Sequence, residues 1–167
     1  MDPFQTIAAV VLGLMLSATC GLRAFLPLGI VSGLGLAGLL DLPDALSWMA
    51  SPVALICFGI ATVMEIVADK IPVVDNAMDT VGTLLRPAAG ALVGGAILAG
   101  ADPLVACVFG LAGGTLIAGA AHTSKATIRA GSTTTTAGTA NPFLSLLEDV
   151  AVVGIGTLAA VGAIAVT

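Results

Sequence analysis

Two carboxylates near the end of an apolar segment have the spacing and the setting for ion binding or proton transfer. Glu65 and Asp69 are four residues apart, so a helix would place them on one face. A carboxylate one turn inside an apolar helix is costly unless it is paired, protonated or in contact with water. We therefore interpret Glu65 as a functional acid, against the alternative of a charge cluster that only ends the segment. For Lys70, which follows Asp69, we favour that simpler alternative.

A second acidic pair follows a segment rich in hydroxyl groups. Residues 131–142 combine serine and threonine side chains with two glycines, which argues against a regular helix. Asn141 suits the N-cap of a following helix, with Pro142 at its first position. Such a helix start offers N–H groups and a dipole that favour an anion. Glu148 and Asp149 come two turns later, about 10 Å along the helix, so we interpret this segment as functional rather than as a plain linker.

Residues 71–86 have the pattern of an amphipathic helix. Apolar residues recur every three or four positions, while Asp75, Asp79 and Arg86 share the other side. An acidic face matches anionic lipid poorly, because such lipid attracts Lys and Arg. We therefore expect Asp75 and Asp79 to turn inward. The alternative is a helix at the membrane surface with a solvated polar face.

A basic stripe is expected further along the chain. His122, Lys125 and Arg129 are spaced three and four residues apart. For Lys125 and Arg129 we expect anchoring by positive charge at the cytoplasmic surface of the membrane. His122 lies at the expected membrane boundary and could titrate near neutrality, although a single histidine is more often only hydrogen-bonded. No metal-ligand spacing is present, so we expect no metal and no cofactor.

Arg23 stands alone between two apolar segments. Arginine cannot lose its charge, so it either extends to the membrane surface or pairs with a buried carboxylate. We predict a salt bridge between one of two arginines, Arg23 or Arg86, and at least one of four acids: Glu65, Asp69, Glu148 and Asp149.

The composition places these residues in a membrane protein. The chain of 167 residues is 58% hydrophobic and 9% charged, whereas a soluble domain carries roughly 25% charged residues. The same values exclude a disordered chain, and five scattered basic residues exclude nucleic acid as a partner. The expected partners are the lipid bilayer and an unknown small solute or ion; a homo-oligomer is left open. We interpret the three cysteines, all in apolar runs, as small buried residues.

The spacing of uncharged stretches predicts an all-α polytopic membrane protein. About 20 residues cross ~30 Å of hydrocarbon, and six stretches approach that length: 3–22, 24–40, 52–64, 87–101, 103–121 and 150–167. We predict about six transmembrane helices arranged as three hairpins, some short or broken at proline, in a single integral-membrane domain over 1–167. A weak repeat relates the hairpins at about 3–45, 52–101 and 103–166. We interpret the GxxxG spacings at Gly29, Gly90 and Gly110 as helix packing.

The charges predict the orientation. Every Lys and Arg lies in the gaps at 22–24, 69–86 and 122–141. In the gaps at 41–51 and 102, by contrast, all the charged residues are acidic. Because basic residues are retained on the cytoplasmic side, we expect a multi-pass inner-membrane protein with both termini outside the cytoplasm.

Four ordered motifs carry a resemblance to a known family. They are Gly21–Leu28, Glu65–Pro72 with Asp75, Arg86-Pro87 with Gly90, and Asn141-Pro142 through Asp149. Together they make the chain similar to a bacterial membrane family described only as a domain of unknown function (family 4126), over nearly its whole length. The threonine-rich run 132–136 departs from that pattern. The resemblance implies a membrane topology and singles out the motifs, but it names no substrate.

The function expected from these residues is transport of a small solute or ion, since ionisable groups near broken helices mark substrate pathways. The alternatives are a membrane-embedded enzyme acting on lipid or isoprenoid head groups, and a structural or assembly protein without a site. The candidate binding residues are Arg23, Glu65, Asp69, Asp75, Asp79, Arg86, His122, Asn141, Glu148 and Asp149.

Overall fold

The computed structural model describes the backbone of residues 1–166, and their side chains except those of Pro72, Val73, Asp75 and Asn76. The described residues form helices, and no strand is present among them. The helices are α1 (Pro3–Leu22), α2 (Phe25–Leu36), the short 3₁₀ helix η1 (Asp44–Met49), α3 (Pro52–Ala68), α4 (Pro72–Ile97), α5 (Pro103–Val105), the π-helical η2 (Ala106–Gly113), α6 (Gly114–Thr136) and α7 (Asn141–Val166).

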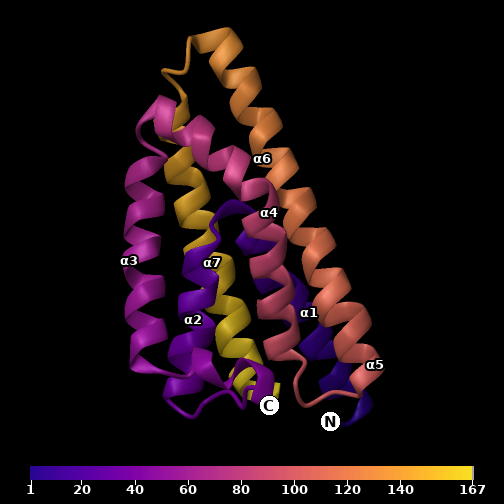
Figure 1. Ribbon diagram of the computed structural model, residues 1–167. Helices are drawn as coiled ribbons and strands as arrows, with labels where there is room; N and C mark the ends of the chain where they lie inside the picture. Colours follow the sequence, from indigo (N-terminus) through magenta and orange to yellow (C-terminus); the bar gives the residue numbers. More distant parts are fainter. Residues whose placement is uncertain (167) are drawn as a thin grey trace.

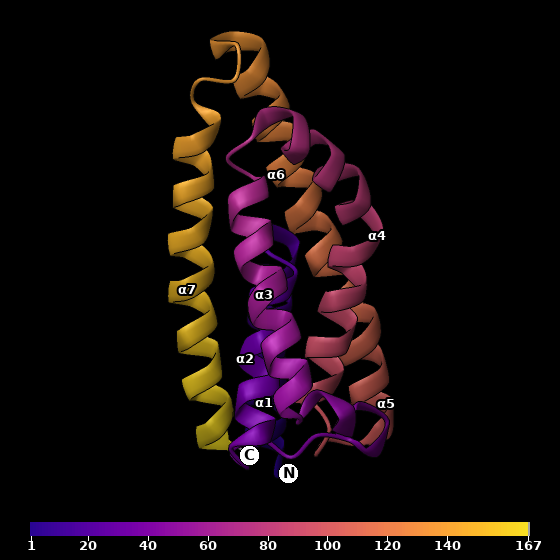
Figure 2. The same cartoon turned by 60° about the vertical axis from the view of Figure 1, so that its left-hand side comes forward.

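Successive long helices run in alternating directions, and both termini lie at the same end of the molecule (Figure 1). The packing, however, does not follow the order of the chain. Helix α1 packs against α4, α6 and α7, whereas α2 packs mainly against α3. Helices α6 and α7 are joined at the end opposite the termini and then diverge, with α1, α2 and α3 between them in this view (Figure 2). A groove between α6 and α7 is lined in part by Leu22, the last residue of α1.

Three helices begin at the end that holds the termini, each with the same local signal. Asp2 accepts from the backbone of Gln5, Ser51 from Ala54 and Asp102 from Leu104. In each case the next residue is proline, which suits the first helical position because its missing N–H would have no helical partner. Side-chain caps thus fix where α1, α3 and α5 start.

Within the described part of the chain, four helical segments are long and apolar enough to cross a membrane: Pro3–Leu22, Ala77–Ile97, Pro103–Thr136 and Asn141–Val166. Helices α2 and α3 are also apolar, but they have only 12 and 17 residues. Many large apolar side chains face outward, among them Phe4, Leu84 and Leu116. An outer surface of this kind fits a surrounding of lipid better than one of water.

Helix α4 continues through Pro87, where we expected a new helix to start. The segments on either side of Pro87 form one helix, and α4 bends along its course (Figure 1). Proline removes one helical hydrogen bond, but Arg86, Ala89, Val93 and Ala96 are all buried. Because their spacing keeps one face of α4 towards the interior, burial holds the helix together across the proline.

Helix α6 likewise extends to Thr136, although its composition predicted an irregular segment from 131 onward. The hydroxyl of Thr135 donates to the carbonyl of Gly131, and that of Thr136 donates to the carbonyl of Ser132 at 2.7 Å. These bonds keep the hydroxyls within the helix instead of competing with it. The helix ends at Ala137, whose φ of 51° is left-handed.

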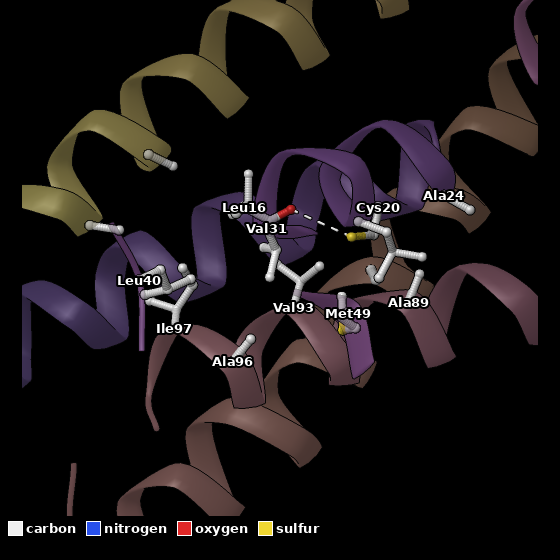
Figure 3. Packing of buried hydrophobic residues seen from close by; sticks show 14 residues of the cluster. Leu16, Cys20, Ala24, Val31, Leu40, Met49, Ala89, Val93, Ala96 and Ile97 are labelled. Carbon is white, nitrogen blue, oxygen red and sulfur yellow. Dashed lines mark hydrogen bonds between the residues drawn. The ribbon is translucent and has the colours of Figure 1, made fainter. Parts of the chain in front are cut away.

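The core lies where α1, α2 and α4 meet. Figure 3 shows Leu16 and Val31 next to Val93, and all three are fully buried. Nearby, Ser17 Oγ donates to the carbonyl of Gly90 at 2.9 Å. A Cβ atom on Gly90 would collide with the carbonyl oxygen of Gly114 on α6, so these two backbones touch directly.

Only one cysteine follows the expectation of burial. Cys20 is buried in the core, while Cys57 and Cys107 are exposed on the outside of the bundle. The prediction was wrong for these two because an apolar run in this chain has an outward as well as an inward face.

Candidate functional site

Arg23 lies in the two-residue break between α1 and α2. Helix α1 ends because Arg23 is extended, with φ −138° and ψ 117°. Just before it, Gly21 rests on the backbone of α6 so closely that a Cβ atom would collide with the carbonyl oxygen of Ala118. The Arg23 side chain is buried, and it stands at the C-terminal, electronegative end of α1. The absence of a side chain at Gly21 therefore brings Arg23 against α6.

Glu65 binds the start of α2. Its Oε1 accepts from the Ala24 N–H at 3.0 Å and its Oε2 from the Phe25 N–H at 3.3 Å. Helix α2 has no side-chain cap of its own, so Glu65 satisfies N–H groups that would otherwise lack a partner. Arg86 Nη2 lies 3.8 Å from Glu65 Oε1 on the other side. Helix dipole and arginine together offset the burial of this carboxylate.

Asp69 is the centre of the site. Its Oδ2 forms salt bridges with three cationic groups: Arg23 Nη1 at 2.6 Å, Lys125 Nζ at 3.0 Å and Arg129 Nη2 at 3.2 Å. Its second oxygen, Oδ1, is buried and has no hydrogen-bond partner. Burial by itself raises the pKa of Asp69, but Lys125, Arg23 and Arg129 outweigh it and hold the pKa below its ordinary value.

Helix α7 supplies two more acids. Glu148 meets Arg129 through two contacts, Nε–Oε1 at 3.2 Å and Nη2–Oε2 at 2.7 Å. Lys125 Nζ lies 3.2 Å from the same Oε2. Asp149 Oδ1 is 2.6 Å from Arg23 Nη2. The side chains of Glu148 and Asp149 are 13% and 21% exposed, so they form the outer edge of the cluster.

Ser145, one turn before Asp149, joins this part of the site. Its fully buried hydroxyl accepts from Arg23 Nη2 at 3.0 Å and from Lys70 Nζ at 3.4 Å. Lys70 is 48% exposed and lies 3.7 Å from Asp149 Oδ2. Its exposed position agrees with the simpler reading of Lys70 as a charge at the end of the segment.

Arg86 connects Glu65 to a second polar group on α4 and α6. Arg86 Nη1 lies 3.2 Å from Asp79 Oδ1 and 2.6 Å from His122 Nδ1. Arginine has only donors, so His122 Nδ1 accepts and the imidazole is neutral in this arrangement. The other ring nitrogen, Nε2, is 3.4 Å from Thr83 Oγ1. Asp79 therefore turns inward, as its position on the amphipathic segment predicted.

Two predicted residues stand apart from these ion pairs. Asn141 begins α7 and is buried; its Nδ2 donates to Thr133 Oγ1 at 3.1 Å, while its Oδ1 has no hydrogen-bond partner. Asn141 thus helps to fasten the start of α7 to the end of α6. The side chain of Asp75 lies outside the described residues.

All five Lys and Arg residues of the chain form ion pairs in this region. Among the side chains that the structure describes, they face five carboxylates, those of Glu65, Asp69, Asp79, Glu148 and Asp149. The cluster they form, called the ion-pair network below, carries no formal net charge when His122 is neutral. The predicted salt bridge of Arg23 or Arg86 is confirmed for both arginines.

The expectation for Lys125 and Arg129 was wrong, because both side chains are buried in the network rather than exposed as anchoring charges. A signal for this was present in the sequence. Gly114, Ala118 and His122 precede them at steps of three or four and are buried on the same face of α6. Small residues at that spacing indicate a packed helix face, and the two basic residues continue it.

Two hollows reach the network from different directions. A groove of about 380 Å³ lies between α6 and α7 and includes Lys125 and Glu148 in its wall. A polar pocket of about 300 Å³ is lined by Asp79, Arg129, Thr133 and Thr134, among others. Since Arg129 and Glu148 bind each other, their ion pair stands between the groove and the pocket. Within the described residues, no group of His, Cys, Asp and Glu side chains is arranged to hold a metal ion.

The chain was compared with known families, curated proteins and solved structures. Residues 10–166 match the model of a family described as a domain of unknown function (DUF4126). No curated protein and no solved structure matches the chain.

Proposed function

Because the chain belongs to the DUF4126 family, whose description assigns no activity, we propose its function from the site itself: transport of a small solute or ion across a membrane, coupled to protons. The observation that carries this proposal is the burial of the ion-pair network among apolar helices. Charged groups at such a depth are costly, and they occur where they line a pathway for ions or substrates. Breaks in the helices beside the charges are typical of transporter sites.

Features of the network itself favour a working site over a purely structural one. Buried ion pairs contribute little net stability, since desolvation opposes their attraction. Three polar atoms of the network are buried without hydrogen-bond partners: Asp69 Oδ1, Arg23 Nε and Arg86 Nε. A network that served only to stabilise the fold would be expected to satisfy such atoms. In addition, the groove and the polar pocket end at the same ion pair, Arg129 with Glu148. These features support a path that the Arg129–Glu148 pair opens and closes.

The proposed topology is a single membrane domain over 1–167 with six helices as three hairpins, in which α2 and α3 are the short members. Both termini lie at one end (Figure 1), and every Lys and Arg lies in the gaps at 22–24, 69–86 and 122–141, which alternate along the chain with the gaps whose only charges are acidic. With basic residues retained inside, the ion-pair network faces the cytoplasm of an inner membrane and both termini lie outside. Close contact between Gly90, Gly94 and the glycines of η2 and α6 supports helix packing of the GxxxG kind.

Two acids are candidates for carrying the proton, and their settings differ. Glu65 is almost completely buried and held by the N-terminus of α2. Glu148 is partly exposed and forms part of the groove wall. A proton and a solute can both reach Glu148 without unfolding of α2. We therefore assign the coupling proton to Glu148 and a positioning role to Glu65.

Flux into proteoliposomes tests the proposal. The purified chain would be reconstituted, and uptake of small organic anions, inorganic anions and cations would be measured at several pH values. We expect pH-dependent uptake of one class of solute, loss of the pH dependence in Glu148→Gln, and no change in Asp41→Asn, which alters an exposed acid outside the network. Size-exclusion chromatography would confirm folding. A folded chain that moves no solute faster than empty vesicles would contradict transport.

A further inference from the structure

The wall of the groove between α6 and α7 is mainly apolar, but one side of it, called the charged side below, holds two charged residues. Lys125 and Glu148 lie on the charged side, and five apolar residues supply most of the remaining wall: Leu22, Ile128, Leu144, Leu147 and Ala151. Its volume of about 380 Å³ falls within the range of small-molecule sites. A ligand that fills it must therefore combine a polar head with an apolar body.

The charged side selects an anion. Glu148 Oε2 is held by Lys125 Nζ at 3.2 Å and Arg129 Nη2 at 2.7 Å. The carboxylate of Glu148 thus occupies a site with two cationic donors, as an acidic ligand would. The side chains of both cations are almost completely buried, whereas Glu148 is the more exposed partner. Movement of Glu148 would open the cationic site to the groove.

Charge balance fixes the valence of that anion. Glu148 is faced by Lys125 and Arg129 from α6 and shares both cations with Asp69, which precedes α4. Asp149 follows it on α7 and pairs with Arg23 and Lys70. When Glu148 takes up a proton, the network loses one negative charge. A single monoanion restores neutrality.

We propose that the groove binds an amphipathic monoanion, whose acidic head takes the place of the Glu148 carboxylate on Lys125 and Arg129 while its apolar chain lies along the groove. The inference rests on the proposed transport function and names the substrate class. The proton held on Glu148 and the bound monoanion then cross the membrane together, so that no net charge is moved. Deprotonation of Glu148 restores its pairs with both cations and expels the anion.

A second groove in the same molecule provides an internal comparison. It has a similar volume, about 360 Å³, and lies on α4, η1 and η2, where its wall includes Leu46, Leu92 and Leu111. None of the residues that line it is charged. It can take an apolar chain but has no group that selects an acidic head. Binding that depends on charge therefore distinguishes the first groove from the second.

The test uses the full chain in nanodiscs and decane-1-sulfonate, an amphipathic anion whose charge does not change with pH. Affinity would be measured by calorimetry at pH 7.5 against empty nanodiscs. Glu148→Gln removes the competing carboxylate and should bind the sulfonate about tenfold more tightly than the unchanged chain, a factor equal to about 1.4 kcal/mol. Decanol, which lacks the charge, should show no gain. Equal sulfonate affinity in both chains, or an equal gain for decanol, would overturn the proposal.

A pair of groove variants makes the test independent of any change in the ion pairs. Ala151→Phe fills the first groove, and Ala106→Phe makes the same change in the second. We expect sulfonate binding to be lost in Ala151→Phe and kept in Ala106→Phe. Loss in Ala106→Phe alone would place the anion in the wrong groove and refute the assignment.

Two sources of such an anion are distinguished by competition. Decanoate represents a free acid, and phosphatidylglycerol in the nanodisc represents a lipid head group, with phosphatidylcholine as its uncharged counterpart. Displacement of the sulfonate by one of them assigns the source and supports the proposal, whereas displacement by neither contradicts it. Because binding is measured without a gradient, a chain that binds but moves nothing would refute transport alone. A chain that transports without this binding would refute the substrate class alone.

Discussion

Asp69→Asn is the change that should weaken the folded state most clearly, because it removes the charge on which three cations converge. Asp69 Oδ2 contacts Arg23, Lys125 and Arg129 at 2.6–3.2 Å and is fully buried. Removing one partner of a buried ion pair costs about 3–5 kcal/mol. Arg23 keeps Asp149, while Lys125 and Arg129 keep Glu148. The expected loss therefore lies at the low end, about 3 kcal/mol.

Thermal unfolding in detergent, followed by circular dichroism, measures this loss. At about 2–4 °C per kcal/mol for a chain of this size, Tm should fall by about 6–12 °C. Asp41→Asn is the matched control, since Asp41 is exposed and surface changes stay within about 0.5 kcal/mol. A Tm for Asp69→Asn within 1–2 °C of the control, on the same scale, would refute the reasoning that the network is anchored at Asp69.

The stabilisation by Asp69 should also depend on pH, in a direction that follows from its lowered pKa. The cations hold the pKa of Asp69 below its ordinary value of 3.8. A carboxyl group with a lowered pKa contributes stability that is present above the ordinary value and is lost as the pH falls through the lowered one. The Tm difference between the unchanged chain and Asp69→Asn should therefore stay constant from about pH 8 to pH 5 and shrink only in stronger acid. A difference that disappears near pH 6 would show that another group carries the effect.

Three further predictions concern packing, capping and topology. Gly90→Ala should cost about 1–3 kcal/mol by overpacking against α6, whereas Gly59→Ala, where a Cβ has open space, should be neutral or stabilising; equal melting temperatures would contradict the close backbone contact. Glu65→Gln should cost about 1–2 kcal/mol, because it weakens the cap of α2 and the pair with Arg86, and hydrogen exchange at the first turn of α2 should speed up; unchanged exchange there would refute the capping role. In a chain whose native cysteines are changed to serine, Asp44→Cys should react with an impermeant reagent from outside and Thr134→Cys only from inside, and the reverse pattern would overturn the proposed orientation.

The local elements were largely predictable because their signals are local. The apolar stretches predicted to begin at 3, 52 and 103 match the starts of α1, α3 and α5, and the inward turn of Asp79 follows from helical periodicity. Arg23 and its acids could be paired because an unneutralisable charge between apolar segments has few partners. These predictions needed no knowledge of which helix lies beside which.

The sequence could not predict which helices and side chains lie next to one another in the fold. Lys125 and Arg129 continue a face of small residues whose spacing indicates packing, but the partners of that face are known only from the packing of α6 on α1. Pro87 has the appearance of a helix start, but the buried face on both sides of it keeps α4 continuous. Ser145 gave no signal, since its role depends on Arg23 and Lys70 reaching it from other segments.

Proton movement driven by an anion gradient tests the central claim most directly. Vesicles that contain the chain and a trapped pH dye would be exposed to an inward gradient of decanoate or of decane-1-sulfonate, with equal potassium on both sides and valinomycin to remove the membrane potential. Only the acidification measured with the sulfonate is decisive. A protonated carboxylic acid crosses lipid unaided and would acidify the interior without the protein. We predict that the interior acidifies with the unchanged chain and with Asp41→Asn, and that it does not with Glu148→Gln. Acidification that is equal in Glu148→Gln, or absent from all three folded proteins, would contradict proton-coupled transport through the ion-pair network.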